Sequence, residues 1–303
     1  MAYDVVILGA GVAGIACAIT LKEFGVSCIV LNAEAETKAC GGGITDKALD
    51  LLKLLGIDPI EFIEKGAKVI KRSKQIYKNG KIRITDYTSR HSIGYSLGIS
   101  RERFDSILHD KAIDKGVEIL EIEKNCCVKK DDYLSVNGIT CKYLVYAMGA
   151  TSNKKIILKK NIKRTFGLSM EVNAELDIKD DAFYFYMENN ETFGDYGWIF
   201  PIGTNRWSVG VWRRDASFLT KDYFDSFYKK VFQPKINLLY SKGKLKGGYI
   251  NCGENKFYKS DKEYYIGDCG GCSNITNGEG IFQALKSGIE AAKDIVTCIN
   301  YTL

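Results

Sequence analysis

The sequence contains few histidines and only a small excess of positive charge. His91 and His109 are the two histidines among 303 residues, and they indicate no Ser-His-Asp arrangement. We interpret His109 as a packing or surface residue of a helix, whereas His91 follows a predicted hairpin and stays open as an acid–base group facing substrate. Lys and Arg number 43 against 37 Asp and Glu, and this net charge of +6 is far from the profile of a nucleic-acid-binding protein.

Internal repeats, low-complexity linkers and a charged leader with a cleavage site are also missing. The composition, 46% apolar and 26% charged, is that of a globular protein with one large domain or two ordinary ones. The ten cysteines are scattered, so we expect free thiols in a cytoplasmic protein. Residues 5–21 form an apolar run, but its glycine spacing favours a nucleotide-binding unit over a transmembrane segment. Peripheral membrane contact stays open.

The first thirty residues predict a strand, a glycine turn, a helix and a second strand. Gly9, Gly11 and Gly14 form the pattern G-x-G-x-x-G directly after the strand and at the start of the helix. The first glycine permits a tight turn, the second lets the backbone approach a pyrophosphate, and the third allows close helix–strand packing. Helix N-terminal amides add positive potential for an anion. This context predicts dinucleotide binding.

An acidic residue that binds ribose hydroxyls usually follows the second strand of such a unit. Asn32 occupies that place here. Its amide can still form hydrogen bonds to a ribose, and Glu34 is close enough in sequence to serve instead. We therefore assign Asn32 as the ribose contact, with Glu34 as the alternative.

The rest of the chain alternates between helical and strand patterns. Thr45 is expected to cap a helix that ends at Gly56, and Asn79-Gly80 predicts a type I′ hairpin turn between residues 69–77 and 81–87. Residues 101–115 predict another helix, residues 166–213 an antiparallel, aromatic-rich sheet, and residues 221–232 and 278–298 two further helices.

A second glycine-rich segment follows the short predicted strand 264–266. It reads Gly267-Asp268-Cys269-Gly270-Gly271 and continues to Gly278, Gly280 and Ile281 at the start of the last helix. A nicotinamide dehydrogenase has no need of such a segment. A flavin enzyme uses a carboxylate such as Asp268 for the ribityl hydroxyls, and helix-terminal amides to stabilise the negative charge of the reduced ring.

Six motifs in order make the chain resemble a known family, and they span nearly its whole length. They are Gly9-x-Gly11-x-x-Gly14, Cys40-Gly41-Gly42-Gly43, Arg101-x-x-Phe104-Asp105, Gly149-Ala150-x-Ser152, Tyr196-Gly197-Trp198-Ile199-Phe200-Pro201, and residues 267–281. The sequence resembles the geranylgeranyl reductase family of FAD-dependent oxidoreductases, which has the para-hydroxybenzoate hydroxylase fold. The resemblance implies that Arg101 and Gly42 lie against FAD and that Asp268 holds the ribityl chain.

We accordingly expect an α/β fold with a Rossmann-like FAD-binding domain and an inserted, mostly antiparallel β-sheet substrate domain. The FAD-binding domain is predicted to comprise residues 1–70, 92–155 and 260–303, and the substrate domain residues 71–91 and 156–259. FAD is the expected cofactor, and NAD(P)H or a reduced protein is an open alternative as electron donor.

The catalytic candidates are Cys40, Tyr196 and Trp198. Cys40 either positions or protonates substrate beside the flavin, or packs a turn as a small residue. Tyr196, Trp198 and Phe200 alternate along one strand and should share a face, which forms either a substrate wall or the core of the second domain.

Other cysteine and lysine patterns are weaker. Cys269 and Cys272 form a C-x-x-C, but without a second such pair we favour small residues in the flavin loop over a redox disulfide, and we expect no metal site. Cys126-Cys127 receives no role. A basic run, comprising Lys154, Lys155, Lys159, Lys160, Lys163 and Arg164, indicates a solvated face, with an anionic headgroup or nicotinamide phosphate as the alternative.

Three functions remain open at this point. The leading hypothesis is reduction of a carbon–carbon double bond in a small hydrophobic or prenylated substrate by hydride from reduced flavin. The alternative is a flavin-dependent monooxygenase, or a halogenase, since Trp198-x-x-Pro201 partly matches the halogenase pattern. A third hypothesis is a non-catalytic flavin-binding redox sensor.

Overall fold

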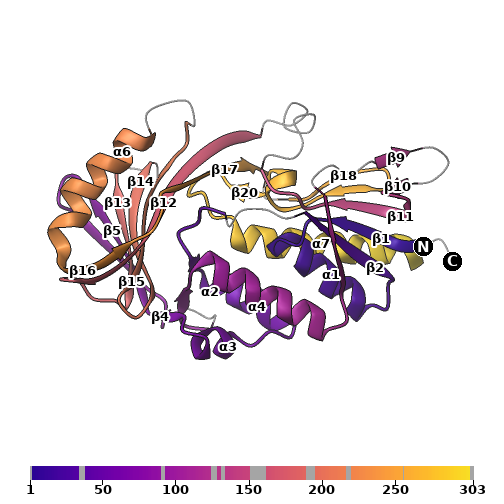
Figure 1. Cartoon of the computed structure of the whole chain (residues 1–303), viewed down its shortest axis with the longest axis horizontal. Coiled ribbons are helices and arrows are strands. Elements are labelled where there is room, and N and C mark those ends of the chain that lie inside the picture. Colours follow the sequence, from indigo (N-terminus) through magenta and orange to yellow (C-terminus); the bar gives the residue numbers. More distant parts are fainter. Residues whose placement is uncertain are drawn as a thin grey trace.

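A computed structural model describes residues 2–33, 38–89, 93–123, 128–130, 134–150, 162–188, 195–215, 220–254 and 256–300. Several residues weighed above lie outside these ranges, namely Glu34, His91, Cys126, Cys127, Lys154, Lys155, Lys159 and Lys160. The described chain forms two sheet-based parts side by side, with the N-terminal strand in one part and helix α6 on the other (Figure 1).

The first sheet is built on the N-terminal strand β1 (Ala2–Leu8), whose continuous apolar run is buried on both faces. The order of its main strands within the described residues is β18 (Tyr258–Ser260), β19 (Glu263–Tyr265), β11 (Ile139–Tyr146), β1, β2 (Cys28–Ala33) and β8 (Glu118–Ile122). Strands β19, β11, β1, β2 and β8 run parallel to one another. A hairpin of β9 (Val128–Lys130) and β10 (Leu134–Val136) extends from β11. The carboxyl ends of the parallel strands therefore share one edge.

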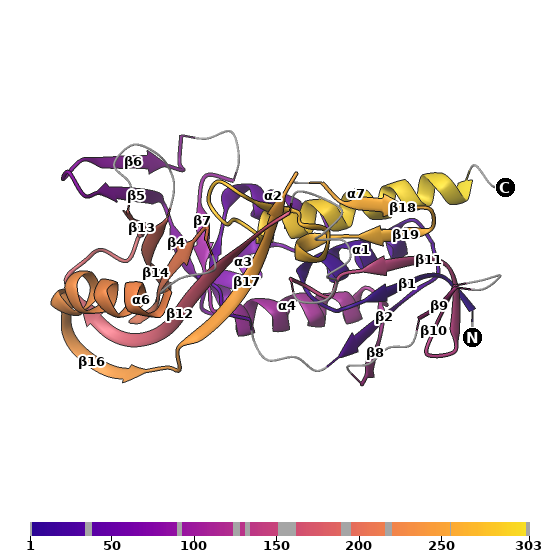
Figure 2. The same ribbon diagram turned by 90° about the horizontal axis from the view of Figure 1, so that it is seen from above.

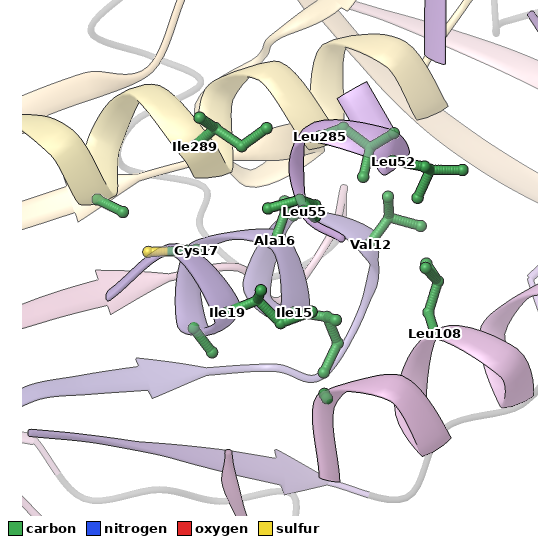
Figure 3. Close-up of a cluster of buried hydrophobic side chains, with 14 of the residues drawn as sticks. Val12, Ile15, Ala16, Cys17, Ile19, Leu52, Leu55, Leu108, Leu285 and Ile289 are labelled. Atoms are coloured by element: carbon green, nitrogen blue, oxygen red, sulfur yellow. The ribbon is translucent and has the colours of Figure 1, made fainter. Parts of the chain in front are cut away.

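Helices on one side of this sheet form the main core together with it. They are α1 (Val12–Glu23), α2 (Asp46–Leu54), α3 (Pro59–Glu64), α4 (Arg101–Asp114) and α7 (Ile281–Asn300). Helix α1 is buried on every side over residues 12–21, and Figure 3 shows its Val12, Ile15 and Ile19 among side chains of neighbouring helices. A β-carbon added at Gly288 of α7 would lie 2.4 Å from the carbonyl oxygen of Ala13, so this glycine permits the close approach of α7 to α1.

The second sheet is mostly antiparallel. Its order within the described residues is β20 (Ser273–Asn274), β17 (Lys246–Gly253), β12 (Lys163–Leu176), β15 (Arg206–Arg213), β14 (Tyr196–Gly203), β13 (Ala182–Met187), β5 (Arg72–Tyr77) and β6 (Ile82–Asp86), with β16 (Ile236–Lys242) also paired to β12. Only the β5–β13 and β17–β20 pairs among them are parallel. The expected fold class is confirmed. Strand β20 shows that the segment after β19 returns to this second sheet.

One face of the second sheet is covered by a short helical segment (Figure 2). It consists of α6 (Thr220–Phe227), a π-helical turn η1 (Tyr228–Phe232) and a 3₁₀ turn η2 (Gln233–Lys235). Phe224, Phe227 and Phe232 pack there against Val209 and Val211 of β15. The opposite face carries aromatic side chains of β13 and β14.

A small third sheet joins the two parts. It contains β3 (Gly43–Ile44), β7 (Ser96–Gly98) and β4 (Lys68–Ile70). A β-carbon at Gly98 would lie 1.8 Å from the carbonyl oxygen of Pro201, which brings β7 into backbone contact with β14. Strand β14 is thus fixed against the segments around Cys40 and Arg101.

The predicted hairpin is present, but the predicted turn type is wrong. Strands β5 and β6 are antiparallel, and Gly80 has φ +83°, whereas Asn79 is not among the described residues with positive φ. The Tyr77 amide donates to the carbonyl of Lys81 at 2.9 Å, so the loop has three residues with one left-handed glycine rather than a two-residue type I′ turn. In the described part of the chain, no helix is long and apolar enough to cross a membrane.

Candidate active site

The glycine turn after β1 combines two tightly packed glycines with one open position. Gly9 has φ +107°, and a β-carbon there would lie 2.7 Å from the carbonyl oxygen of Ala147. At Gly14 a β-carbon would lie 2.0 Å from the carbonyl oxygen of Gly9, whereas at Gly11 it would meet no atom within 4 Å. Gly11 therefore faces free space at the N-terminus of α1, as a backbone that receives a pyrophosphate requires.

The late glycine-rich segment forms a folded loop between β19 and α7. Gly267–Gly270 is a 3₁₀ turn, η3, and the Asp268 carboxylate accepts a 2.6 Å hydrogen bond from Ser273 Oγ. The Asn251 amide donates to the backbone carbonyl of Asp268 at 3.1 Å. Helix α7 begins at Ile281, slightly later than predicted, with Gly280 before it and Gly278 in the left-handed region at φ +69°.

These two glycine-rich segments lie against each other. A β-carbon at Gly267 would lie 3.0 Å from the β-carbon of Ala13, which belongs to the first turn of α1. The Gly267 amide is also held by Ser287 Oγ of α7 at 3.0 Å. The opening turn and the entrance to the last helix thus border one site, although more than two hundred residues separate them.

The Cys40 loop packs on strand β14. A β-carbon at Gly41 would lie 3.0 Å from the ring of Phe200, and Gly42 has φ +73° with the Ile99 carbonyl oxygen 2.3 Å from the place of its β-carbon. Cys40 itself is half-buried, and its Sγ accepts a hydrogen bond from the Gly42 amide at 3.4 Å. A side chain is therefore excluded at Gly42 by the Ile99 backbone and crowded at Gly41 by the Phe200 ring.

A chain of hydrogen bonds links this loop to an aromatic wall. Trp198 Nε1 donates to Ser208 Oγ at 3.1 Å, and Ser208 Oγ in turn donates to the Cys40 carbonyl at 3.4 Å. Tyr196, Trp198 and Phe200 lie in one buried cluster, as the strand alternation predicts, together with Trp212 of β15. The Trp198 ring is fixed from its polar end, so the indole serves as a rigid surface.

Arg101 lies at the start of α4 and borders Cys40. Its Nε donates to the Asp105 carboxylate at 2.7 Å, and its side chain is only 12% exposed. Burial alone would lower the pKa of Arg101, but the charges of Asp105 and Cys40 and hydrogen bonds to both outweigh burial and raise it. Arg101 is therefore a permanent cation beside the Cys40 thiol.

Tyr196 joins the aromatic wall to the late loop. Its hydroxyl donates to the Asn277 carbonyl at 2.9 Å, one turn before α7 begins. Burial, followed by the nearby Glu279, Cys40 and Cys252, raises the pKa of Tyr196. The phenol consequently stays protonated and remains a hydrogen-bond donor.

Glu279 is a functional candidate that the motif analysis missed, although it stands inside the glycine-rich segment. Its Oε1 accepts a 2.9 Å hydrogen bond from Thr45 Oγ1. Burial raises the pKa of Glu279; the Thr45 hydrogen bond and Lys47 oppose this shift, and Asp46 adds to it. Thr45 stands at the N-cap position of α2 as predicted, but its side chain does not cap the helix. The sequence feature that could have pointed to Glu279 is its place between Gly278 and Gly280 in the late glycine-rich segment.

Asn32 lies beside the glycine turn, at the end of β2. Its Oδ1 accepts a hydrogen bond from the Ala10 amide at 3.1 Å, and its Nδ2 donates to the Glu121 carboxylate at 3.0 Å and 3.3 Å. Glu121 pairs with Asn32 in the parallel register of β2 and β8. Sequence analysis missed Glu121 because only the strand order brings it to this edge.

The remaining candidates are buried in the late loop or lie apart from the Cys40 cluster. Cys269 and Cys272 are buried and form no disulfide, and Cys272 Sγ donates to the Lys256 carbonyl at 3.2 Å. His109 is half-buried on α4. Of the basic run, Lys163 and Arg164 are described, and they line an open depression beside the late loop with Arg214, Asp215 and Ile275.

Comparison with known proteins identifies the family. Residues 2–238 match the FAD binding domain family, which is more than half of the chain. The chain belongs to this family. It is an FAD-dependent oxidoreductase, and the resemblance to geranylgeranyl reductases inferred from the motifs is confirmed by its relatives.

Among the named sequence relatives of this flavoprotein, two match nearly its whole chain as follows. The menaquinone reductase of Mycobacterium tuberculosis (strain H37Rv) is 25% identical, over 96% of this chain and 76% of the relative. The digeranylgeranylglycerophospholipid reductase of Methanosphaerula palustris is 24% identical, over 98% of this chain and 77% of the relative.

Many solved structures share the fold of the flavoprotein, and two of them are compared with it below. A geranylgeranyl bacteriochlorophyll reductase-like protein from Thermoplasma acidophilum has a TM-score of 0.81 at 20% identity, covering 99% of this chain and 79% of that one. PqsL from Pseudomonas aeruginosa, a probable FAD-dependent monooxygenase, has a TM-score of 0.76 at 18% identity, covering 100% and 88%.

The residues of the site fit FAD. The open space at Gly11 matches the approach of a pyrophosphate to backbone amides, because a side chain there would fill it. The Asp268 carboxylate and Ser273 hydroxyl provide the polar groups suited to a ribityl chain, next to α1. Gly280 brings backbone close to the same region, since a β-carbon there would lie 3.1 Å from Ser273 Oγ and 3.8 Å from Asp268 Oδ1, whereas Gly278 packs its backbone against the Trp212 ring.

Proposed function

We propose that this flavoenzyme reduces a carbon–carbon double bond in a hydrophobic, isoprenoid-bearing substrate. The observation that carries the proposal is the meeting of the half-buried Cys40, the Tyr196–Trp198 wall and the Glu279–Thr45 pair beside the late flavin loop. The names of the two sequence relatives, a menaquinone reductase and a digeranylgeranylglycerophospholipid reductase, support this substrate class.

In this proposal Gly9, Gly11 and Gly14 hold the pyrophosphate of FAD, and Asp268 holds its ribityl chain. Gly42, Gly278, Gly280 and Ile281 let backbone amides approach the ring, and Arg101 supplies positive charge beside it. When bound and reduced, FAD supplies a hydride to an alkene carbon. The contribution of the protein is orientation, exclusion of water and provision of a proton.

The aromatic wall suits an apolar substrate. The polar atoms of Tyr196 and Trp198 are bonded to Asn277 and Ser208, so they are fixed rather than offered to solvent. Their side chains are 8% and 6% exposed, next to Phe200 and Trp212. In this proposal Tyr196 and Trp198 therefore shape the substrate site and exclude water from it.

The proton that completes alkene reduction is assigned to Glu279. Its raised pKa keeps the carboxyl protonated to a higher pH than an ordinary glutamate, which is the property required of a general acid. Thr45 Oγ1 fixes the orientation of the carboxyl group. Cys40, next to the Arg101 cation, is assigned to orienting the substrate.

The test is a single-turnover experiment without oxygen. Holoprotein is photoreduced anaerobically and mixed with geranylgeranyl lipids that carry no quinone ring, since a quinone would itself accept electrons from reduced flavin, or with a saturated analogue, and flavin absorbance is followed. We expect reoxidation by the unsaturated compounds and none by the saturated analogue. Reoxidation that requires oxygen in addition to substrate would instead indicate a monooxygenase, and a flavin that no compound reoxidises would indicate a redox sensor. Omitting the photoreductant and adding NADPH, NADH or reduced ferredoxin identifies the electron donor.

A further inference from the structure

The ribose contact predicted for FAD-binding folds requires a pair of strong acceptors at the end of the second strand. The adenosine ribose offers two neighbouring hydroxyl donors, and a carboxylate accepts from both. Asn32 occupies this position, and its carbonyl oxygen already accepts the Ala10 amide at 3.1 Å. A neutral amide committed to the glycine turn is therefore a weak substitute for the missing carboxylate.

A carboxylate nevertheless stands at the same edge. Glu121 lies on β8, directly beside Asn32, and both of its oxygens are within hydrogen-bond distance of Asn32 Nδ2, at 3.0 Å and 3.3 Å. Glu121 is exposed rather than enclosed in the core, so its carboxylate can accept further hydrogen bonds. The three strands β1, β2 and β8 are parallel, so their carboxyl ends share the edge where this fold binds dinucleotides.

We propose that Glu121 supplies the carboxylate that binds the adenosine ribose hydroxyls of FAD, and that Asn32 positions it by bridging Glu121 to the glycine turn. In this proposal the ribose-binding carboxylate comes from β8, the strand next to β2, instead of from β2 itself. The pair keeps one negative charge, and its hydrogen bond runs from the Asn32 amide to the Glu121 carboxylate.

This assignment predicts that the charge of the pair matters, not merely its hydrogen bond. In Glu121→Gln the amide oxygen still accepts from Asn32 Nδ2, so a purely structural role would survive the change. Loss of the carboxylate should raise the dissociation constant of FAD roughly tenfold, the size expected for losing charge-assisted hydrogen bonds. Exchanging the partners in the double variant N32D/E121Q restores a single carboxylate, now accepting from Ala10 and from the new amide. FAD affinity should recover to near that of the wild type.

The experiment measures the dissociation constants of FAD and FMN on the full-length chain by quenching of flavin fluorescence. FMN lacks the adenosine half, so E121Q should leave its affinity unchanged, which separates ribose recognition from damage to the fold. Glu118→Gln is the matched control, because it changes the same charge at the other end of β8, where Glu118 accepts a 2.8 Å hydrogen bond from Tyr3. The variant Glu34→Gln tests Glu34, the acidic residue expected from the sequence as the alternative ribose contact.

Selective loss of FAD affinity in E121Q, with recovery in N32D/E121Q, supports the proposal. It is overturned if E121Q binds FAD as E118Q does, if FAD and FMN weaken together, if the exchange variant does not recover, or if E34Q alone reproduces the selective loss.

Discussion

The hydroxyl of Thr45 donates a 2.9 Å hydrogen bond to Oε1 of Glu279, although the two residues are 234 positions apart. Because Thr45 precedes α2 and Glu279 precedes α7, this bond ties the segment after Cys40 to the late glycine-rich loop. The hydrogen bond lowers the pKa of a carboxyl whose burial raises it. The protonation state of Glu279 therefore depends on a partner that can be removed by mutation.

The pH dependence of alkene-driven reoxidation should report Glu279. In the wild type the rate should fall as the pH rises through the raised pKa, because only the protonated carboxyl has a proton to give. Thr45→Val removes the hydrogen bond that favours the charged form, so the midpoint should move upward, by about one pH unit. Glu279→Gln should be slow and independent of pH over this range. A midpoint that is the same in wild type and T45V would contradict the assignment.

The same carboxyl should affect folding stability. The folded protein binds its proton more tightly than the unfolded chain does, since the folded-state pKa is raised. The contribution of the protonated Glu279 carboxyl to the free energy of unfolding is therefore fully present below the unfolded-state pKa. It is lost as the pH rises through the folded-state pKa. Urea unfolding of wild type and E279Q at several pH values checks this sign: the stability of the wild type relative to E279Q should decline with rising pH.

Two glycines of the nucleotide turn should respond oppositely to alanine. Gly11 has φ −74° and ψ 178°, which alanine adopts readily, and its β-carbon would meet no atom within 4 Å. Gly11→Ala should therefore fold normally but lose FAD affinity, because the methyl group fills the space of the pyrophosphate. Gly14→Ala would place its methyl 2.0 Å from the Gly9 carbonyl oxygen and should destabilise the fold itself. Thermal unfolding and flavin titration separate the two effects. An unchanged FAD affinity in G11A would argue against a pyrophosphate site at this glycine turn.

The nucleotide turn could be predicted from sequence because its requirements are local. Backbone approach and positive φ select glycine at Gly9 whatever the distant chain does. The shared face of Tyr196 and Trp198 follows equally from strand alternation. These features needed no knowledge of the tertiary contacts.

Two of the missed features depend on residues that are distant in sequence, and the third on the local pairing of a hairpin. Thr45 was expected to cap a helix, the local use of a threonine at that position, but its hydroxyl instead reaches Glu279. The pairing of Asn32 with Glu121 requires the register of two parallel strands joined by a long crossover. The sequence Asn79-Gly80 is compatible with a two-residue type I′ turn and with a three-residue loop. The pairing of Tyr77 with Lys81 selects the three-residue loop.

Asp268 should contribute to FAD binding through its carboxylate. It already accepts a 2.6 Å hydrogen bond from Ser273 Oγ, which fixes its orientation beside Gly280. Asp268→Ala should weaken FAD binding by roughly ten- to a hundredfold, as expected for the loss of hydrogen bonds to a charged group. Asp261→Asn, in the exposed turn between β18 and β19, is the control with the same loss of charge. Equal FAD retention in D268A and D261N would remove Asp268 from the cofactor site.

Tyr196 should help to hold the late loop in place through the hydrogen bond of its hydroxyl. Its hydroxyl donates to the Asn277 carbonyl at 2.9 Å, so Tyr196→Phe frees the segment that leads into Gly278. We expect a loss of about 1 kcal/mol of unfolding free energy and faster FAD dissociation, because this loop borders the site proposed for the flavin. Tyr184→Phe is the matched control: the Tyr184 hydroxyl also donates to a backbone carbonyl at 2.9 Å, that of Lys179, before β13. Stopped-flow measurement of flavin release after displacement should show a faster rate in Y196F alone, and equal rates in both variants would mean that the tie to Asn277 has no part in holding the cofactor.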